Sequence, residues 1–359
     1  MYKVCFDDIV FELQKAGGIS KYWGKLIKNT YKNKDIKNVN IQGKNAKHNV
    51  FFSEKYSQKV ISYNFFPLSI RRYLPIFRTY DCDIVHSSYY RVPLFKRKNI
   101  KQVVTVHDFM YEFFDTGFKR KIHIWQKKKA MLNADAIICV SKHTKKDLVE
   151  LYPDINSDIL YIVPNGVDEE FKPLDQKKIN SNLLLYVGNR SGCKNFEFIL
   201  RLMSQSKYIQ QRKFNLMCVG GGKFSKIELD LFKEYELSGV ITQVLSVSNE
   251  KLNQFYNEAY ALLFPSKYEG FGIPALEAQM AGCPVVYANT SSLPEVMGYT
   301  ELGYTLDDLE GAVNALQLLE NKDFKRLMIG KGILHASSLT WENSVNLTHE
   351  VYKKVITHD

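Results

Sequence analysis

The chain has 359 residues, of which 45% are hydrophobic and 24% charged, and its net charge is +11. At roughly 100–200 residues per domain, this length predicts two domains, and the composition is that of an ordinary globular protein. No apolar run approaches the ~18 residues of a membrane span, and the N-terminal stretch lacks the features of a signal peptide.

Cysteine usage points to a reducing compartment. The six cysteines are scattered along the chain, with no C-x-x-C pair. Most lie in apolar, strand-like runs, which favours buried reduced thiols over disulfides or a zinc site. The sequence therefore predicts a cytosolic protein.

The charge is unevenly distributed. Residues 1–167 hold 29 Lys and Arg against 15 Asp and Glu, whereas residues 168–359 hold 20 against 23. The two halves are therefore expected to meet different partners. A basic domain can bind nucleic acid, an anionic membrane or a phosphorylated acceptor.

The first half alternates strand-like and helical patterns. Short, β-branched runs at 83–88, 101–108 and 135–141 end in polar residues, and the last two enclose helical spacing over 118–133. This β-α-β rhythm predicts a parallel sheet covered by helices.

A second series of strands is expected to begin near 159–168. It continues with four further apolar runs, at 182–190, 214–222, 259–266 and 283–289. The turn residues Pro164, Asn165 and Gly166 mark the domain boundary, which gives domains 1–166 and 167–340. Ligands of open α/β sheets bind at the carboxyl ends of the strands, so two such Rossmann-like domains facing each other would form a cleft.

The stretch KYEGFGIPALEAQMAGCPVV (267–286) predicts a loop followed by a helix. Gly270 and Gly272 permit bends, and Pro274 suits the first turn of a helix. Backbone N–H groups at such a helix start form an anion site suited to a diphosphate. The residues expected to supply them are Phe271, Gly272 and Ile273.

Two glutamates flank this anion site. Glu269 precedes the bend and Glu277 lies about one turn into the helix, where carboxylates can accept hydrogen bonds from hydroxyls. A diphosphate with a polyol at each end describes a nucleotide sugar. The alternative is an ordinary helix N-terminus with two surface acids.

The segment EGFGIPALE (269–277) resembles the E-x7-E signature of glycosyltransferase family 4, which comprises retaining enzymes of the GT-B fold. Other segments resemble the family's motifs in the same order. They are GGIS (17–20), VTVHD (104–108), CVSKHTKKDL (139–148), IVPNGVDEEF (162–171) and YVGNRSGCKN (186–195). The resemblance implies an α/β protein with two Rossmann-like domains, and a C-terminal helix, 341–359, that crosses back to the first domain.

The resemblance also implies catalytic roles. Arg190 and Lys194 would neutralise the diphosphate leaving group, although Arg190 follows an inserted-looking Asn189. His107 would contact a hydroxyl or the developing charge of the donor sugar, its alternative being a strand-end histidine satisfied by backbone. Glu269 would bind the sugar.

Further donor contacts are expected from small residues and one loop. Gly17 and Gly18 would let a loop approach phosphate and acceptor, Gly188 would open the diphosphate loop, and the amide of Val247 would read the nucleobase. His86 and Asp108 are assigned to the acceptor side, with a structural role for His86 as the alternative.

No cofactor or metal is expected. Asp81 and Asp83 match a D-x-D pattern, but they open the strand at 83–88, away from the expected cleft. Strand capping is therefore favoured over metal binding, and the cations Arg190 and Lys194 would do the work of a metal.

Aromatic residues accompany positive charge at 63–78, 89–98 and 118–129. Such segments can lie on an anionic membrane, which suits a family whose bacterial acceptors are often lipid-diphosphate-linked glycans. We therefore expect a cytoplasmic protein, peripheral at the inner face of the cytoplasmic membrane. A solvated basic surface is the alternative, and nucleic acid is not expected because no binding module is present.

These observations lead to one functional hypothesis and several alternatives. A retaining, metal-independent glycosyltransferase would move a hexose, with mannose from GDP-mannose favoured, to a hydroxyl of a lipid-linked or growing O-antigen or capsule glycan. The alternatives are another GDP-, UDP- or dTDP-linked donor, a sugar phosphate synthase or UDP-N-acetylhexosamine epimerase of the same fold, or a non-catalytic protein bound to anionic membrane.

Overall fold

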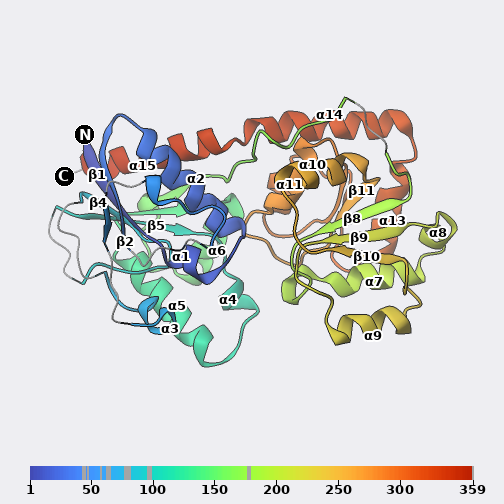
Figure 1. The fold of residues 1–359 in the computed structure, drawn as a ribbon, viewed down its shortest axis with the longest axis horizontal. Helices are drawn as coiled ribbons and strands as arrows, with labels where there is room; N and C mark the ends of the chain where they lie inside the picture. Colours follow the sequence, from blue (N-terminus) through green and yellow to red (C-terminus); the bar gives the residue numbers. More distant parts are fainter. Residues whose placement is uncertain are drawn as a thin grey trace. The chain divides into compact units, whose positions relative to one another are not determined.

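A computed structural model describes residues 1–42, 46, 48–56, 59–61, 66–76, 82–94, 99–175 and 179–357. The chain forms two compact units (Figure 1). The first domain comprises Met1–Asn165 and Trp341–Asp359, and the second comprises Gly166–Thr340. The division falls within the predicted turn, one residue before the expected boundary.

The first domain is built on a seven-stranded parallel sheet of order β3-β2-β1-β4-β5-β6-β7. Its strands are β1 (Tyr2–Asp7), β2 (Ile36–Gln42), β3 (Lys59–Ile61), β4 (Ile84–His86), β5 (Lys101–Val106), β6 (Ala136–Cys139) and β7 (Leu160–Ile162). The residues of β4 and β6 are buried throughout, as expected for strands covered on both faces.

The helices of the first domain lie between these strands in the sequence, except for one that follows the second domain. They are α1 (Ile9–Leu13), α2 (Gly18–Lys32), α3 (Leu68–Arg71), α4 (Met110–Phe113), α5 (Gly117–Leu132), α6 (Lys142–Leu151) and α15 (Trp341–Thr357), with 3-10 turns η1 (Glu54–Tyr56) and η2 (Ser157–Ile159). The strand order reverses between β1 and β4, so the carboxyl ends of these two strands form the switch point of the first sheet.

The second domain has a six-stranded parallel sheet of order β10-β9-β8-β11-β12-β13. The strands are β8 (Leu183–Val187), β9 (Asn215–Val219), β10 (Ile241–Val244), β11 (Ala261–Phe264), β12 (Val285–Ala288) and β13 (Gly303–Tyr304). Here the order reverses between β8 and β11, which is the strand order of a Rossmann sheet.

The helices of the second domain begin at residues that suit a helix start. They are α7 (Phe196–Gln205), α8 (Lys207–Gln211), α9 (Lys226–Glu234), α10 (Asn249–Glu258), α11 (Ile273–Met280), α12 (Leu293–Met297), α13 (Leu309–Leu318) and α14 (Lys322–Ser338), with a 3-10 turn η3 (Gly192–Lys194). Ser225 and Glu228 form a capping box at α9, and Ser248 caps α10, which satisfies otherwise unbonded N–H groups.

The sequence-based prediction was wrong about one strand. The stretch near 159–168 was expected to open the second series, but β7 pairs with β6 through Leu160 and Ile137 in the first sheet. The domain turn follows this strand instead of preceding it. The parallel α/β architecture of both domains is confirmed.

Helix α15 packs against the first domain. The ring nitrogens of His349 lie 3.0 Å from Thr30 Oγ1 and 2.8 Å from Asn33 Nδ2, both near the end of α2. Tyr352 Oη lies 2.6 Å from His86 Nδ1. None of the helices in the described ranges is long and apolar enough to cross a membrane.

The buried His349 predicts a pH-dependent stability. Burial lowers the pKa of His349 to about 4, against about 6.5 in an unfolded chain. Between pH 4 and pH 6.5 the unfolded state binds more protons at this residue than the folded state does. The contribution of His349 to the free energy of unfolding is therefore fully present above about pH 6.5 and is lost as the pH falls. Between pH 7 and pH 5 the wild-type chain should lose about 2 kcal/mol more stability than His349→Gln.

Urea unfolding of the two proteins at pH 7, 6 and 5 measures this difference. Glutamine keeps an amide that can reach Thr30 and Asn33 but does not titrate. Parallel pH profiles for the two proteins would contradict the prediction.

Candidate active site

Three loops meet at the carboxyl edge of the second sheet, at its switch point. They follow β8, β11 and β12, and hydrogen bonds join them. The backbone N–H of Lys267 donates to the carbonyl of Cys193 at 2.7 Å, and Thr290 Oγ1 donates to the carbonyl of Ser266 at 3.0 Å. This edge is where open α/β sheets bind their ligands.

The centre of this site is an ion pair between Lys194 and Glu269. Lys194 Nζ lies 2.7 Å from Glu269 Oε1, and Ser266 Oγ donates to the same oxygen at 2.7 Å. The backbone of Glu269 is held as well, because its N–H donates to Ser291 Oγ at 2.9 Å and its carbonyl accepts from Ser292 Oγ at 2.9 Å. The structure thus brings together two of the predicted catalytic residues.

Helix α11 begins directly beside this pair. Gly272, its N-cap residue, has φ of 99°, and a Cβ there would lie 2.9 Å from Leu293 Cδ2. Both the left-handed conformation and this close approach favour glycine. Ser292 Oγ also donates to the carbonyl of Phe271 at 3.1 Å. Pro274 has no N–H, and the N–H groups of Ala275 and Leu276 donate to the carbonyl of Gly272 at 3.0 and 3.4 Å. The N–H groups that this helix start would offer to an anion are therefore the predicted ones, those of Phe271, Gly272 and Ile273.

Glu277 lies one turn into α11. Its Oε2 lies 3.4 Å from Tyr256 Oη, whose single proton is shared between this oxygen and the carbonyl of Pro274 at 3.2 Å. Burial, followed by the nearby Glu277 carboxylate, raises the pKa of Tyr256 well above its usual value, so the phenol stays protonated and donates. Glu269 and Glu277 are both buried, which is unlike the surface acids of the alternative interpretation.

Arg190 occupies a different environment from Lys194. Its guanidinium lies 2.5 Å from Glu228 Oε1 and donates to the carbonyls of Gly220 and Gly222, each at 3.0 Å. Only 3% of its side chain is exposed. Arg190 therefore closes the glycine turn after β9 in this structure, and its predicted role at a diphosphate stays a prediction.

In the first domain, His107 follows β5. Its Nε2 is enclosed and has no hydrogen-bond partner within the described ranges, and its ring packs edge-on against Tyr22 at 5.0 Å. Burial lowers the pKa of His107 to about 4, with Asp108 and Lys127 as smaller influences. At neutral pH the imidazole is therefore uncharged and retains an unused nitrogen.

His86 is completely buried, and both of its ring nitrogens are engaged. Besides Tyr352, it contacts Thr105 Oγ1 at 2.9 Å through Nε2, and that hydroxyl lies 2.9 Å from Tyr22 Oη. This arrangement fits the structural role that the sequence left open for His86. Its assignment to the acceptor side stays a prediction, and its buried position with both nitrogens engaged does not support that role.

The remaining predicted residues lie on loops and helix starts. Gly17 is the N-cap of α2, where a Cβ would lie 1.9 Å from Gln14 Oε1, and Gly18 is its first residue. Asp108 Oδ1 accepts from the N–H of Met110 at 3.1 Å. Val247 is half-buried in the loop between β10 and α10.

Gly188 directly follows β8 with φ of 125°, and its N–H donates to the carbonyl of Val219 at 3.0 Å. Asp83 precedes β4, as predicted, and its carboxylate accepts from the N–H of Lys3 at 2.7 Å. Asp81 lies outside the described residues.

Sequence reasoning missed the polar side chains that orient the ion pair. Ser266, Ser291 and Ser292 each follow the end of a buried strand. The only sign of these serines in the sequence is that they follow strands. That sign indicates a shared site only when the two strands are neighbours in the sheet. Tyr256 was missed because it lies on a helix that carries no motif.

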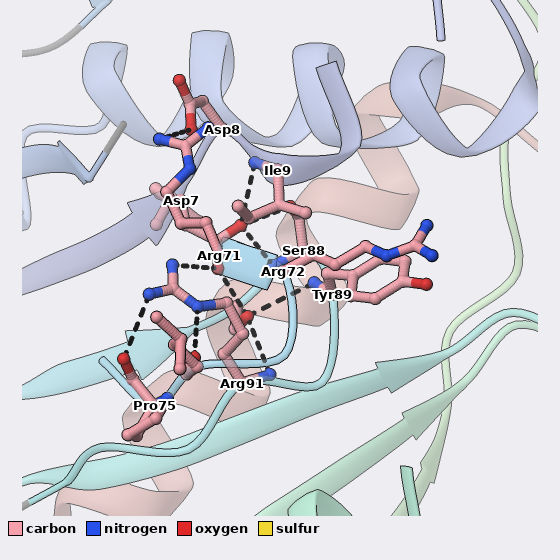
Figure 2. Close-up of polar contacts among 12 residues, drawn as sticks. Asp7, Asp8, Ile9, Arg71, Arg72, Pro75, Ser88, Tyr89 and Arg91 are labelled. Atoms are coloured by element: carbon pink, nitrogen blue, oxygen red, sulfur yellow. Dashed lines mark hydrogen bonds and ion pairs between the residues drawn. The ribbon is translucent and has the colours of Figure 1, made fainter. Parts of the chain in front are cut away.

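A second missed network occupies the switch point of the first sheet (Figure 2). Asp7, at the end of β1, accepts hydrogen bonds from Ser87 Oγ at 2.6 Å and from the N–H of Ser88 at 3.1 Å, and it lies 3.6 Å from Arg91 Nη1. Arg71 pairs with Asp8 and Glu12 beside it. The carboxylate of Asp7 is therefore held by the protein's own contacts, whereas the buried Nε of Arg71 has no hydrogen-bond partner within the described ranges.

The chain matches two family models. Residues 47–171 match the model described as Glycosyltransferase Family 4, and residues 167–336 match Glycosyl transferases group 1. Together they extend over most of both domains.

Among relatives, the chain is 24% identical over 298 residues to O-antigen chain mannosyltransferase B of Escherichia coli, covering 79% of this chain and 77% of that protein. It is 26% identical over 239 residues to O-antigen chain mannosyltransferase RfbU of Salmonella typhimurium, covering 66% and 65%. The second match therefore spans just under two thirds of that relative's length.

Solved structures share the fold. Sucrose-phosphate synthase from Thermosynechococcus elongatus matches with a TM-score of 0.79 at 18% identity, covering 100% of both chains. A glycosyltransferase from Rickettsia africae matches with a TM-score of 0.73 at 15% identity, covering 100% of this chain and 99% of its own. With its two parallel-sheet domains and both family models matched, the chain carries a Glycosyltransferase Family 4 domain followed by a Glycosyl transferases group 1 domain, and it has the GT-B fold.

Proposed function

We propose that this glycosyltransferase binds a nucleoside-diphosphate sugar at the carboxyl edge of the second sheet and transfers the sugar with retention of configuration. The observation that carries the proposal is the Lys194–Glu269 pair beside the start of α11. A cation, a helix N-terminus and a carboxylate are the groups that recognise a diphosphate attached to a polyol.

The cation and the helix start would act on the leaving group. As the bond between the sugar and the diphosphate breaks, negative charge grows on the phosphate oxygens. Lys194 Nζ and the N–H groups of Phe271, Gly272 and Ile273 would stabilise that charge more in the transition state than in the ground state. The side chain of Lys194 is only 25% exposed, which limits screening by water.

The acidic residues would bind hydroxyls on either side. Glu269 would accept from the donor sugar, whereas Glu277, held by Tyr256, would accept from the ribose, and the amide of Val247 would contact the base. Neutral His107, with its unused Nε2, would contact a sugar hydroxyl. No metal or cofactor is part of this proposal.

The proposed reaction needs no protein nucleophile. The acceptor hydroxyl would attack the anomeric carbon on the face from which the diphosphate departs. A bond forms between the acceptor oxygen and the anomeric carbon as the bond between that carbon and the phosphate oxygen breaks. The proton of the acceptor hydroxyl passes to a departing phosphate oxygen. The configuration at the anomeric carbon is thereby retained.

Mannose from GDP-mannose is our preferred donor, and a lipid-linked or growing O-antigen or capsule glycan is our preferred acceptor. Support comes from two relatives that are O-antigen chain mannosyltransferases. Work on such an acceptor would place the protein at the inner face of the cytoplasmic membrane.

The donor is tested by incubating the full chain with a panel of GDP-, UDP- and dTDP-linked sugars and a lipid-linked glycan acceptor. We expect nucleoside diphosphate release with GDP-mannose and an α-linked product by NMR, since the donor is itself α-linked. Turnover restricted to UDP- or dTDP-sugars would reject GDP-mannose, and a β-linked product would reject retention.

Substitution of Lys194 tests the charge assignment. Lys194→Gln should lower kcat by about 10²–10³, the usual effect of removing one group that stabilises transition-state charge. Steady-state kinetics with saturating donor measure the change, with Lys233→Gln, an exposed lysine on α9, as the matched control. Equal kcat values for Lys194→Gln and the control would reject the role.

Arg190 offers a separate test, because its contacts differ from those of Lys194. Arg190→Gln should destabilise the second domain by about 1–3 kcal/mol, since the half-buried Glu228 and the glycine carbonyls lose their charged partner. Urea unfolding measures this loss, and Glu228→Gln should reproduce part of it. A kcat loss as large as that of Lys194→Gln with unchanged stability would instead support a direct role at the diphosphate.

A further inference from the structure

Helix α5 has an unusual distribution of side chains. Its buried residues include the polar His123, Gln126 and Lys127, whereas Phe118 is 76% and Trp125 60% exposed. A helix on the surface of a globular protein normally buries its apolar side and exposes its polar side. In α5 this rule is reversed over much of the helix.

The buried polar side is held by specific contacts. Lys127 Nζ donates to the carbonyl of Asp108 at 2.6 Å and lies 3.0 Å from Glu112 Oε1. Gln126 Nε2 donates to the carbonyl of Arg72 at 2.8 Å, which joins α5 to the end of the neighbouring α3 (Figure 1). These bonds fix the rotation of α5 about its axis, so the outward direction of its apolar residues is determined by the fold.

The outward residues form one stripe. At 3.6 residues per turn, five exposed positions fall within about 80° of the helix circumference. They are Phe118, Lys121, Trp125, Lys129 and Leu132, which we call the α5 face. Lys129 Nζ lies 5.1 Å from the centre of the Trp125 ring. Phe113 and Phe114, just before the helix, are also exposed.

The charge of the helix indicates which kind of partner would bind the α5 face. Residues 117–132 contain six Lys and Arg and no Asp or Glu. Aromatic rings that enter the headgroup region, together with lysines that reach anionic headgroups, are the pattern of a helix lying on a membrane surface. An acidic protein partner would complement the charge but would not by itself account for exposed Phe118, Trp125 and Leu132.

We propose that the α5 face docks the protein on anionic phospholipid bilayers. The biological purpose rests on the proposed function, because a lipid-linked acceptor would be met at that surface. The docking itself can be measured without any sugar transfer, so the two proposals can fail separately.

Tryptophan fluorescence provides a direct measurement. The chain has three tryptophans, and Trp23 and Trp341 are buried, so an environmental change on docking would come from Trp125. Adding vesicles of phosphatidylcholine with phosphatidylglycerol to the full chain should shift the emission to shorter wavelength. Pure phosphatidylcholine should give a smaller shift, and high salt should reduce binding to the anionic vesicles.

Variants assign the binding to the α5 face. Phe118→Ala with Trp125→Ala, and separately Lys121→Gln with Lys129→Gln, should each weaken vesicle binding by roughly tenfold in flotation assays. Matched controls are Ile227→Ala and Leu334→Ala, exposed aliphatic residues of the second domain. All these positions are exposed, and donor-dependent nucleotide release without membranes should be unchanged.

Three outcomes would overturn the proposal. The first is no binding to anionic vesicles. The second is equal binding by the α5 variants and the controls. The third is concentration-dependent self-association in analytical ultracentrifugation that the α5 substitutions abolish, which would identify a second copy of the chain as the occupant. Retained vesicle binding by an inactive protein would leave the docking intact and reject the enzymatic proposal alone.

Discussion

The ion pair between Lys194 and Glu269 is the interaction on which the candidate site depends. It joins the loops after β8 and β11, neighbouring strands at the point where the order of the second sheet reverses. Ser266, Ser291 and Ser292 hold the glutamate, and Ser292 also donates to the carbonyl of Phe271, directly before the N-cap residue of α11. Because these hydrogen bonds already hold the partly buried pair, its side chains need little reorganisation when a charged ligand binds. The preorganised groups lie in the loops, and the sheet fixes the positions from which the loops begin.

Local signals were sufficient to predict this part of the protein. The strand, glycine bend and helix of residues 259–286 are encoded by neighbouring residues, and α11 forms where Pro274 and the following helix formers predicted it. The contacts of Arg190 could not be predicted, because they depend on the carbonyls of a turn after a different strand. The assignment of β7 failed for the same reason: a three-residue strand is defined by its partner, and β6 lies in the first sheet. Strand pairing and side-chain direction are properties of the tertiary structure.

The two domains use the same strand order differently. In the second, the switch point presents a cation, two buried carboxylates and a helix start. In the first, Asp7, Ser87, Ser88 and Arg91 bind one another at the corresponding edge. Burial lowers the pKa of His86, the last residue of β4, and of His107, which follows β5. Of these two histidines, only His107 keeps a nitrogen without a hydrogen bond within the described ranges. A shared architecture therefore does not imply a shared chemistry.

The position of α15 has a consequence for biosynthesis. This helix supplies Tyr352 to His86 and His349 to Thr30 in the first domain, yet residues 166–340 of the second domain precede it in the chain. During translation the N-terminal portion must wait on the order of tens of seconds for its last helix. Throughout that interval the groove that α15 will fill, lined by α2, β5 and β6, remains open to solvent and to chaperones, and the order of synthesis requires the second domain to emerge before the first can be completed.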